Sequence, residues 1–195
     1  QTWEREDFTQ VAWAPDGSSV ALFEPYAGGI ELYDLPAVRL TWSSERWVAD
    51  LIFPSDGKGL IASDVDTRSI SFLQRADGQE STSLSDDDCG YFPPEQLVLD
   101  NATGVLFAGV GTPALGPDQT SVYLWDVRSS QCKGLFVRHQ GEFNSLDLSP
   151  DGTTLLVGLY DAGVPYVAQT HLWNTATREL KCWFRAEDAL FPPSG

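Results

Sequence analysis

The residues that could do chemistry are few in type and far apart. The two histidines, His139 and His171, are widely separated, and the three cysteines, Cys89, Cys132 and Cys182, form no CxxC pair. Zinc sites need closely spaced Cys and His ligands, so this spacing predicts no metal site. The odd number of thiols favours a reducing compartment, with the cysteines as ordinary strand residues, over a disulfide framework.

Motifs that build known kinds of active site are missing from the sequence. It holds no GxSxG nucleophile elbow, no HExxH zinc motif, no Walker-type loop and no GxGxxG between a strand and a helix. The stretch GVGTPALG at 109–116 lies between predicted strands, where a phosphate-binding role is not expected. We therefore predict a protein that is not an enzyme and that uses no cofactor.

Acidic side chains dominate the charge, with 28 Asp and Glu against 12 Lys and Arg and a formal net charge of −16. This charge repels phosphate backbones and anionic lipid surfaces, so we predict no binding to nucleic acid or to membranes. No segment approaches the roughly 18–20 apolar residues of a membrane-spanning helix. We expect an intracellular protein whose partners are other proteins, some with a basic patch.

A repeated unit would have to position any functional residue. Three segments share an apolar strand followed by an Asp-Gly turn, namely FTQVAWAPDG at 8–17, VADLIFPSDG at 48–57 and FNSLDLSPDG at 143–152. A fourth, PEQLVLDNATG at 94–104, keeps the strand and changes the turn. In these turns we expect Gly to take a positive φ and Asp to bond back to its own backbone.

The spacing of this unit is that of a propeller blade. The last apolar residues before the turns are 40, 46 and 49 positions apart: Trp13, Phe53, Leu99 and Leu148. The ends of the predicted third strands are 40, 52 and 48 apart: Asp34, Gln74, Asp126 and Asn174. Both markers indicate an all-β chain of four four-stranded antiparallel blades, over about 8–43, 48–84, 94–137 and 143–185. Frequent Pro and Gly and short apolar runs argue against long surface helices.

Part of the repeat resembles a known family. RHQGEFNSLDLSPDGTTLLVGLYD at 138–161 resembles the consensus of WD-repeat β-propellers, and SVYLWD at 121–126 and THLWN at 170–174 resemble its terminal Trp-Asp signature. The resemblance is partial before residue 74, where Tyr33 and Leu73 stand at the tryptophan position. It implies a β-propeller that acts as a protein-interaction scaffold.

The resemblance also assigns roles to single residues. In the family, a histidine, a second-strand Ser or Thr, a turn aspartate and a third-strand tryptophan form a hydrogen-bonded network that stiffens one blade. Leu159 or a near neighbour stands at the hydroxyl position here, so the network would be incomplete. The matching residues here are His139, Asp161 and Trp173, and Trp125 with Asp126 retains the Trp-Asp pair. These residues, and His171 within its strand, are therefore expected to be structural rather than catalytic.

Four blades do not decide whether this chain forms a closed propeller ring by itself. Propellers that resemble this family usually have six to eight blades, so the resemblance implies about half a ring. A second chain, a second copy or further sequence would then supply the remaining blades. A closed four-bladed ring is the alternative, because propellers of four blades exist.

Three long insertions are the candidate contact surfaces, because loops on a rigid β scaffold often carry binding specificity. They cover 75–96, 111–120 and 160–170. The candidate binding residues in them are Asp86, Asp87, Asp88, Tyr91, Phe92, Pro113, Asp118, Tyr160 and Tyr166.

Two other functions compete with the scaffold. A propeller hydrolase or lyase would need carboxylates at the ring axis, for which Asp64, Asp66 and Asp161 are the suggestive residues. A lectin-like module would stack sugars on solvent-facing indoles, with Trp3, Trp42, Trp47 and Trp183 as candidates. Tryptophans packed between sheets would favour the scaffold instead.

Overall fold

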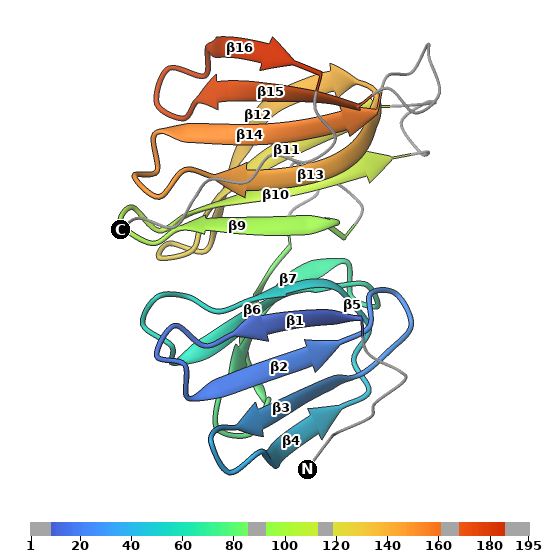
Figure 1. Ribbon diagram of the computed structural model, residues 1–195, viewed down its shortest axis with the longest axis vertical. Helices are drawn as coiled ribbons and strands as arrows, with labels where there is room; N and C mark the ends of the chain where they lie inside the picture. Colours follow the sequence, from blue (N-terminus) through green and yellow to red (C-terminus); the bar gives the residue numbers. More distant parts are fainter. Residues whose placement is uncertain (1–8, 86–92, 113–118, 161–167, 186–195) are drawn as a thin grey trace. The chain divides into compact units, whose positions relative to one another are not determined.

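The computed structural model describes residues 9–85, 93–112, 119–160 and 168–185. Their regular secondary structure is entirely β, with strands β1 to β16 in four-stranded antiparallel sheets and no helix within the described ranges (Figure 1). The predicted fold class, all-β with four four-stranded antiparallel blades, is confirmed. The chain divides into two compact units, 1–85 and 86–195.

The first unit contains two sheets in which each strand pairs with the next along the chain. The strands of the first sheet are β1 (Gln10–Trp13), β2 (Ser19–Phe23), β3 (Ile30–Asp34) and β4 (Arg39–Ser44). The strands of the second sheet are β5 (Val48–Ile52), β6 (Gly59–Asp64), β7 (Ser69–Gln74) and β8 (Glu80–Leu84).

The second unit repeats this arrangement. The strands of the third sheet are β9 (Gln96–Asp100), β10 (Val105–Thr112), β11 (Gln119–Asp126) and β12 (Gln131–Gln140). The strands of the fourth sheet are β13 (Glu142–Leu148), β14 (Thr154–Tyr160), β15 (Ala168–Asn174) and β16 (Leu180–Phe184).

The Asp-Gly turns between the first two strands of a sheet have the predicted geometry. Gly17 and Gly152 have φ of 68° and 71°, a region that glycine enters without steric cost. The preceding aspartates accept hydrogen bonds two residues on, Asp16 from the Ser18 N–H at 3.0 Å and Asp151 from the Thr153 N–H at 3.0 Å. These corners therefore form from local chemistry alone.

In the first unit the two sheets bury one apolar cluster between them. Its members from the first sheet are Ala12, Ala21, Phe23, Ile30, Leu32 and Trp42. Its members from the second are Val48, Leu51, Leu60, Ala62 and Leu73, with Phe53 packed at its margin. Because side chains alternate along a strand, each sheet contributes one of its two faces to this core.

The second unit has an equivalent core. The third sheet contributes Phe107, Val122, Leu124 and Phe136, and the fourth contributes Phe143, Leu146, Leu155, Val157 and Leu159, with Leu148 and Trp173 packed against them. The residues from the fourth sheet stand at the same register positions as those from the second, since Leu60 pairs with Leu73 as Leu155 pairs with Trp173. In both units, the same face of the later sheet is turned toward the sheet before it.

Arg75 links the two sheets of the first unit at the end where their Asp-Gly turns lie. Its guanidinium donates to the Gly57 carbonyl of the second sheet at 3.0 Å and to the Ser19 hydroxyl of the first at 2.8 Å. It also pairs with Asp16 at 3.2 Å, and its backbone carbonyl accepts the Trp42 indole N–H at 2.9 Å. Arginine suits this role because its planar fork serves several acceptors at once.

Cys132 takes part in a disulfide, whereas Cys182 is free and exposed. The expectation that all three cysteines are reduced strand residues is therefore wrong for Cys132, because spacing in the sequence does not reveal which thiols meet in space. Within the described ranges, no helix has the length and apolar character needed to cross a membrane.

Candidate functional site

A row of aromatic rings runs between the outer strands of the second unit. It consists of Phe136, Trp173, His139, His171 and Trp183, which we call the aromatic row. Centroid separations are 6.4 Å from Phe136 to Trp173, 5.2 Å from Trp173 to His139 and 4.5 Å from His139 to His171. Trp183 continues the row at 6.2 Å from His171. Most of these contacts are edge-to-face, the arrangement that aromatic quadrupoles favour.

Three strands position these rings. Phe136 and His139 lie on β12 of the third sheet, where register shifts interrupt the pairing with β11. His171 and Trp173 lie two residues apart on β15 and so share a face of the fourth sheet, and His171 pairs directly with Trp183 on β16. The row is thus assembled by packing the third sheet against the fourth.

Three polar atoms of the row are buried and have no hydrogen-bond partner in the structure as described: His139 Nε2, His171 Nδ1 and Trp173 Nε1. Burial lowers the pKa of His139 to about 4, with a smaller contribution from neighbouring His171. Burial also lowers the pKa of His171. Both rings are therefore neutral at pH 7. Buried polar groups are normally paired, so this concentration of unpaired ones marks the row as unusual.

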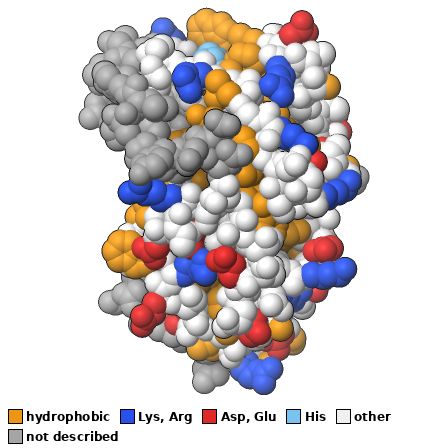
Figure 2. All heavy atoms as spheres, turned by 180° about the vertical axis from the view of Figure 1, so that it is seen from behind, with side chains coloured by type: hydrophobic (Ala, Val, Ile, Leu, Met, Phe, Trp, Pro, Cys, Tyr) orange, Lys and Arg blue, Asp and Glu red, His pale blue; other side chains and the backbone are white. Residues whose placement is uncertain are grey.

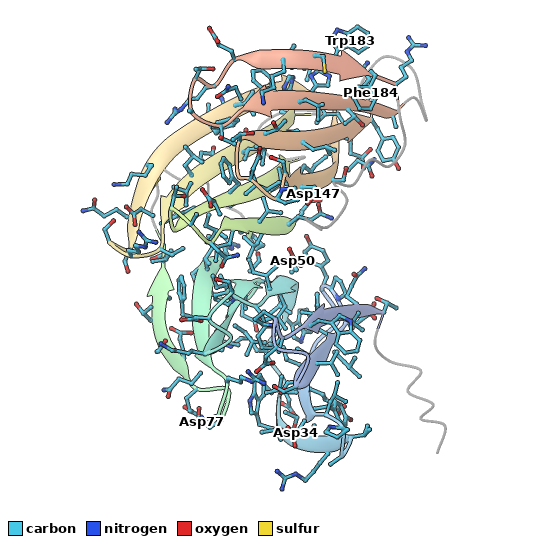
Figure 3. All side chains as sticks on the ribbon, turned by 60° about the vertical axis from the view of Figure 1, so that its left-hand side comes forward. Asp34, Asp50, Asp77, Asp147, Trp183 and Phe184 are labelled. Atoms are coloured by element: carbon cyan, nitrogen blue, oxygen red, sulfur yellow. The ribbon has the colours of Figure 1, made fainter. Side chains whose placement is uncertain are left out.

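The outer end of the row is open to solvent. Trp183 is 55 % exposed and Leu180, on the same strand, is 42 % exposed. Leu135 on β12 is also exposed, but it pairs with Tyr123 and lies on the other face of the third sheet from Phe136. Figure 2 shows hydrophobic side chains gathered around a histidine at this end of the second unit, and Figure 3 labels Trp183 on β16. Arg178 lies beside the patch, with its guanidinium 5.9 Å from the Phe136 ring centroid.

The structure brings together two of the three residues expected to form the blade network, His139 and Trp173. Asp161, the third, lies outside the described residues. Trp125 is buried in β11. Asp126 accepts hydrogen bonds from the Arg128 and Ser129 N–H groups and so caps the turn after β11. The hydrogen bonds of the network remain a prediction.

Most of the predicted binding loops lie outside the described residues. This applies to Asp86, Asp87, Asp88, Tyr91, Phe92, Pro113, Asp118 and Tyr166. Tyr160 is described, and it is an exposed residue at the end of β14.

Two residues of the aromatic row and its surroundings, Phe136 and Leu180, were not predicted from the sequence. A usable signal was the run LKCWF at 180–184, whose apolar residues all remain exposed in β16.

The described carboxylates that were suggested for an enzyme site at the ring axis lie in an ion pair or in a turn. Asp64 is buried and forms an ion pair with Arg46, which also bonds Glu80 at 2.9 Å. Asp66 lies in the turn between β6 and β7. Burial raises the pKa of Glu95, which accepts a hydrogen bond from the Gly111 N–H at 3.0 Å. Among the described residues no group of three or more His, Cys, Asp or Glu is arranged to hold a metal ion.

The candidate stacking tryptophans differ in exposure. Trp42 is buried between the sheets of the first unit. Trp47 and Trp183 face solvent, and Trp3 lies outside the described residues. The tryptophans therefore include both packed indoles and indoles available to a ligand.

Comparison with known proteins shows the fold. No family model and no curated protein matches the sequence, so membership of the WD-repeat family is not shown. Among solved structures, the chain is similar to Kuenenia stuttgartiensis hydrazine synthase, with a TM-score of 0.74 and 14% sequence identity. The match covers 90% of this chain and 48% of that chain, so the present chain spans about half its length. Together with the blade topology, the likeness identifies a β-propeller fold.

Proposed function

We propose that this chain is a non-enzymatic protein-interaction scaffold and that the aromatic row is its principal contact surface. The observation that carries the proposal is a pair of exposed apolar side chains on one face of β16, Leu180 and Trp183. Contiguous exposed apolar side chains on a folded domain commonly mark a binding surface. Tryptophan with an apolar surround is also the composition of interface hot spots.

The charge of the chain indicates what kind of partner fits. A net charge of −16 favours an apolar contact surrounded by basic side chains on the partner, because complementary charges steer association. The same charge supports the proposal that neither nucleic acid nor anionic membranes bind.

Quantitative affinity purification from the native source tests this function. Trp183→Glu places a charge in the centre of the patch, and Gln131→Glu adds the same charge at an exposed position at the start of β12. We expect specific partners to be recovered with the wild type and Gln131→Glu, and to fall at least about tenfold with Trp183→Glu, the scale of a hot-spot residue. Equal recovery with both variants would refute the role of the row.

A lectin-like module is the second candidate, and the exposed indole of Trp183 beside His171 is the observation that favours it. Sugar rings stack on exposed indoles with polar groups nearby. Glycan-array binding that is lost in Trp183→Glu, without recovery of any protein partner, would establish this function in place of the scaffold.

The intracellular location predicted from the cysteine count is also a proposal. The disulfide at Cys132 weakens it, because disulfides are rare in cytosolic and nuclear proteins. Titration of free thiols in protein unfolded without a reducing agent decides between the two locations. Three free thiols support an intracellular protein, and a single free thiol supports an oxidising compartment.

A further inference from the structure

The turn between β9 and β10 differs in sequence from its counterparts. The other three sheets make this turn with Asp-Gly, whereas the third sheet uses DNATG at 100–104. Within it, Asn101-Ala102-Thr103 has the pattern Asn-x-Thr, with x other than Pro, that accepts an N-linked glycan. Neither Asn144 nor Asn174 has Ser or Thr two residues later, so the chain carries this acceptor pattern once.

The structure presents the acceptor pattern at the surface. Asn101, Ala102 and Thr103 are all exposed and lie outside the apolar core of the second unit. The turn is closed by its backbone, because the Gly104 N–H donates to the Asp100 carbonyl at 2.8 Å and the Ala102 N–H donates to the Asp100 carboxylate at 3.0 Å. A sugar on Asn101 can therefore extend into solvent without disturbing the packing of the sheets.

An independent observation, the disulfide at Cys132, concerns the compartment. Disulfides persist in oxidising compartments such as the secretory pathway and are rare in cytosolic and nuclear proteins. N-linked glycans are likewise found on surface loops of secreted proteins. The disulfide and the exposed acceptor turn thus favour the same compartment. A glycan on Asn101 excludes the intracellular location, and it is independent of the scaffold function.

We propose that Asn101 carries an N-linked glycan. In the transfer step the side-chain nitrogen Nδ2 of Asn101 forms a bond to the anomeric carbon of an oligosaccharide held on a lipid pyrophosphate. The bond from that carbon to the pyrophosphate oxygen breaks, the lipid pyrophosphate leaves with the electron pair, and the amide loses one proton. Thr103 supplies the hydroxyl group that completes the acceptor pattern.

The glycan also limits where partners can bind. A Cβ atom added at Gly152 would stand 3.2 Å from the Asp100 carboxylate, so the corresponding turns of the third and fourth sheets lie side by side. A bulky, solubilising sugar on Asn101 therefore covers this end of the second unit. Trp183 lies on β16, outside these turns, and stays available to a partner.

Peptide mass spectrometry of the protein purified from its native source tests the proposal. We expect the peptide that contains Asn101 to carry a glycan, and peptide-N-glycosidase F in heavy-oxygen water to leave a labelled Asp at this position. Asn101→Gln and Thr103→Ala should abolish the modification. Thr103→Ser keeps the hydroxyl group and should keep the glycan, and Asn144→Gln is the matched control that should also keep it.

The contrary results are equally definite. An unmodified peptide containing Asn101 from the native protein overturns the proposal, whether the thiol titration gives one free thiol or three. A glycan that persists in Asn101→Gln, or that survives Thr103→Ala, lies on another residue and overturns it as well. Recovery of partners with Trp183→Glu is measured separately, so failure of the scaffold function and failure of the glycan are distinguishable.

Discussion

Replacing Gly109 by Ala should destabilise the second unit through contact with a single ring. Gly109 lies in β10 of the third sheet, between its partners Gln96 and Val122. A Cβ atom added there would stand 2.6 Å from two ring carbons of Phe143 in the fourth sheet, and its next neighbour, Leu146, is at 3.5 Å. The close approach of the two sheets therefore depends on the missing side chain.

The magnitude follows from opposing effects. Forcing one extra carbon into a packed core costs typically about 1–3 kcal/mol. Alanine is otherwise the better residue within a strand by roughly 0.5–1 kcal/mol. In the Phe143→Leu background the ring is gone, so Gly109→Ala should be neutral or stabilising by up to about 1 kcal/mol. The sign of the effect should thus change between the two backgrounds.

Urea unfolding of the four proteins of this cycle, followed by far-ultraviolet circular dichroism, measures the coupling. We expect a coupling free energy of about 1–3 kcal/mol between the two substitutions, because the gain from alanine cancels between the backgrounds and the overpacking cost remains. This exceeds the additivity error for independent sites. Additivity within about 0.5 kcal/mol would show that the Phe143 ring does not lie over Gly109, and the proposed packing of the two sheets would be incorrect.

Further predictions concern polar groups. Arg75→Ala should lower the free energy of unfolding by about 1–3 kcal/mol, because the Ser19 hydroxyl and the Gly57 carbonyl lose their donor. Urea midpoints check this, and an unchanged midpoint contradicts it. The lowered pKa of His139 means that the unfolded chain binds more protons between pH 6.5 and about 4, so stability should fall as the pH drops through this range. The slope contributed by one partly exposed group is below about 1.4 kcal/mol per pH unit, and His139→Phe should reduce it. An identical slope in that variant would disprove the assignment.

The parts of the fold that depend on neighbours in sequence could be predicted. The Asp-Gly corners are fixed by two adjacent residues, and the strand that leads to each corner follows from a short apolar run. Three such corners, with a turn of different sequence at 100–104, recur at blade-like spacing and were enough to predict four antiparallel sheets. The buried residues could be predicted only in part. The alternation of side chains along a strand assigns Leu60 and Leu155 to a core, but it does not show which sheet covers them.

The candidate site could not be predicted in the same way. His139 and His171 meet only because β12 packs over β15, and the register shifts in β12 rotate its side chains out of simple alternation. The disulfide at Cys132 likewise depends on proximity in space. Trp13 and Trp183 are exposed whereas Trp42 is buried, and the sequence of one strand does not contain that information.

The central claim is that each unit consists of two blades packed face to face, with the aromatic row at the outer edge of the second pair. Nuclear Overhauser contacts in a sample with labelled Phe, Trp and Gly test it most directly. The account predicts contacts from the Phe143 ring to the Gly109 α-protons and from Phe136 to Trp173, in addition to those within each sheet. Contacts within sheets but none between these pairs would contradict it.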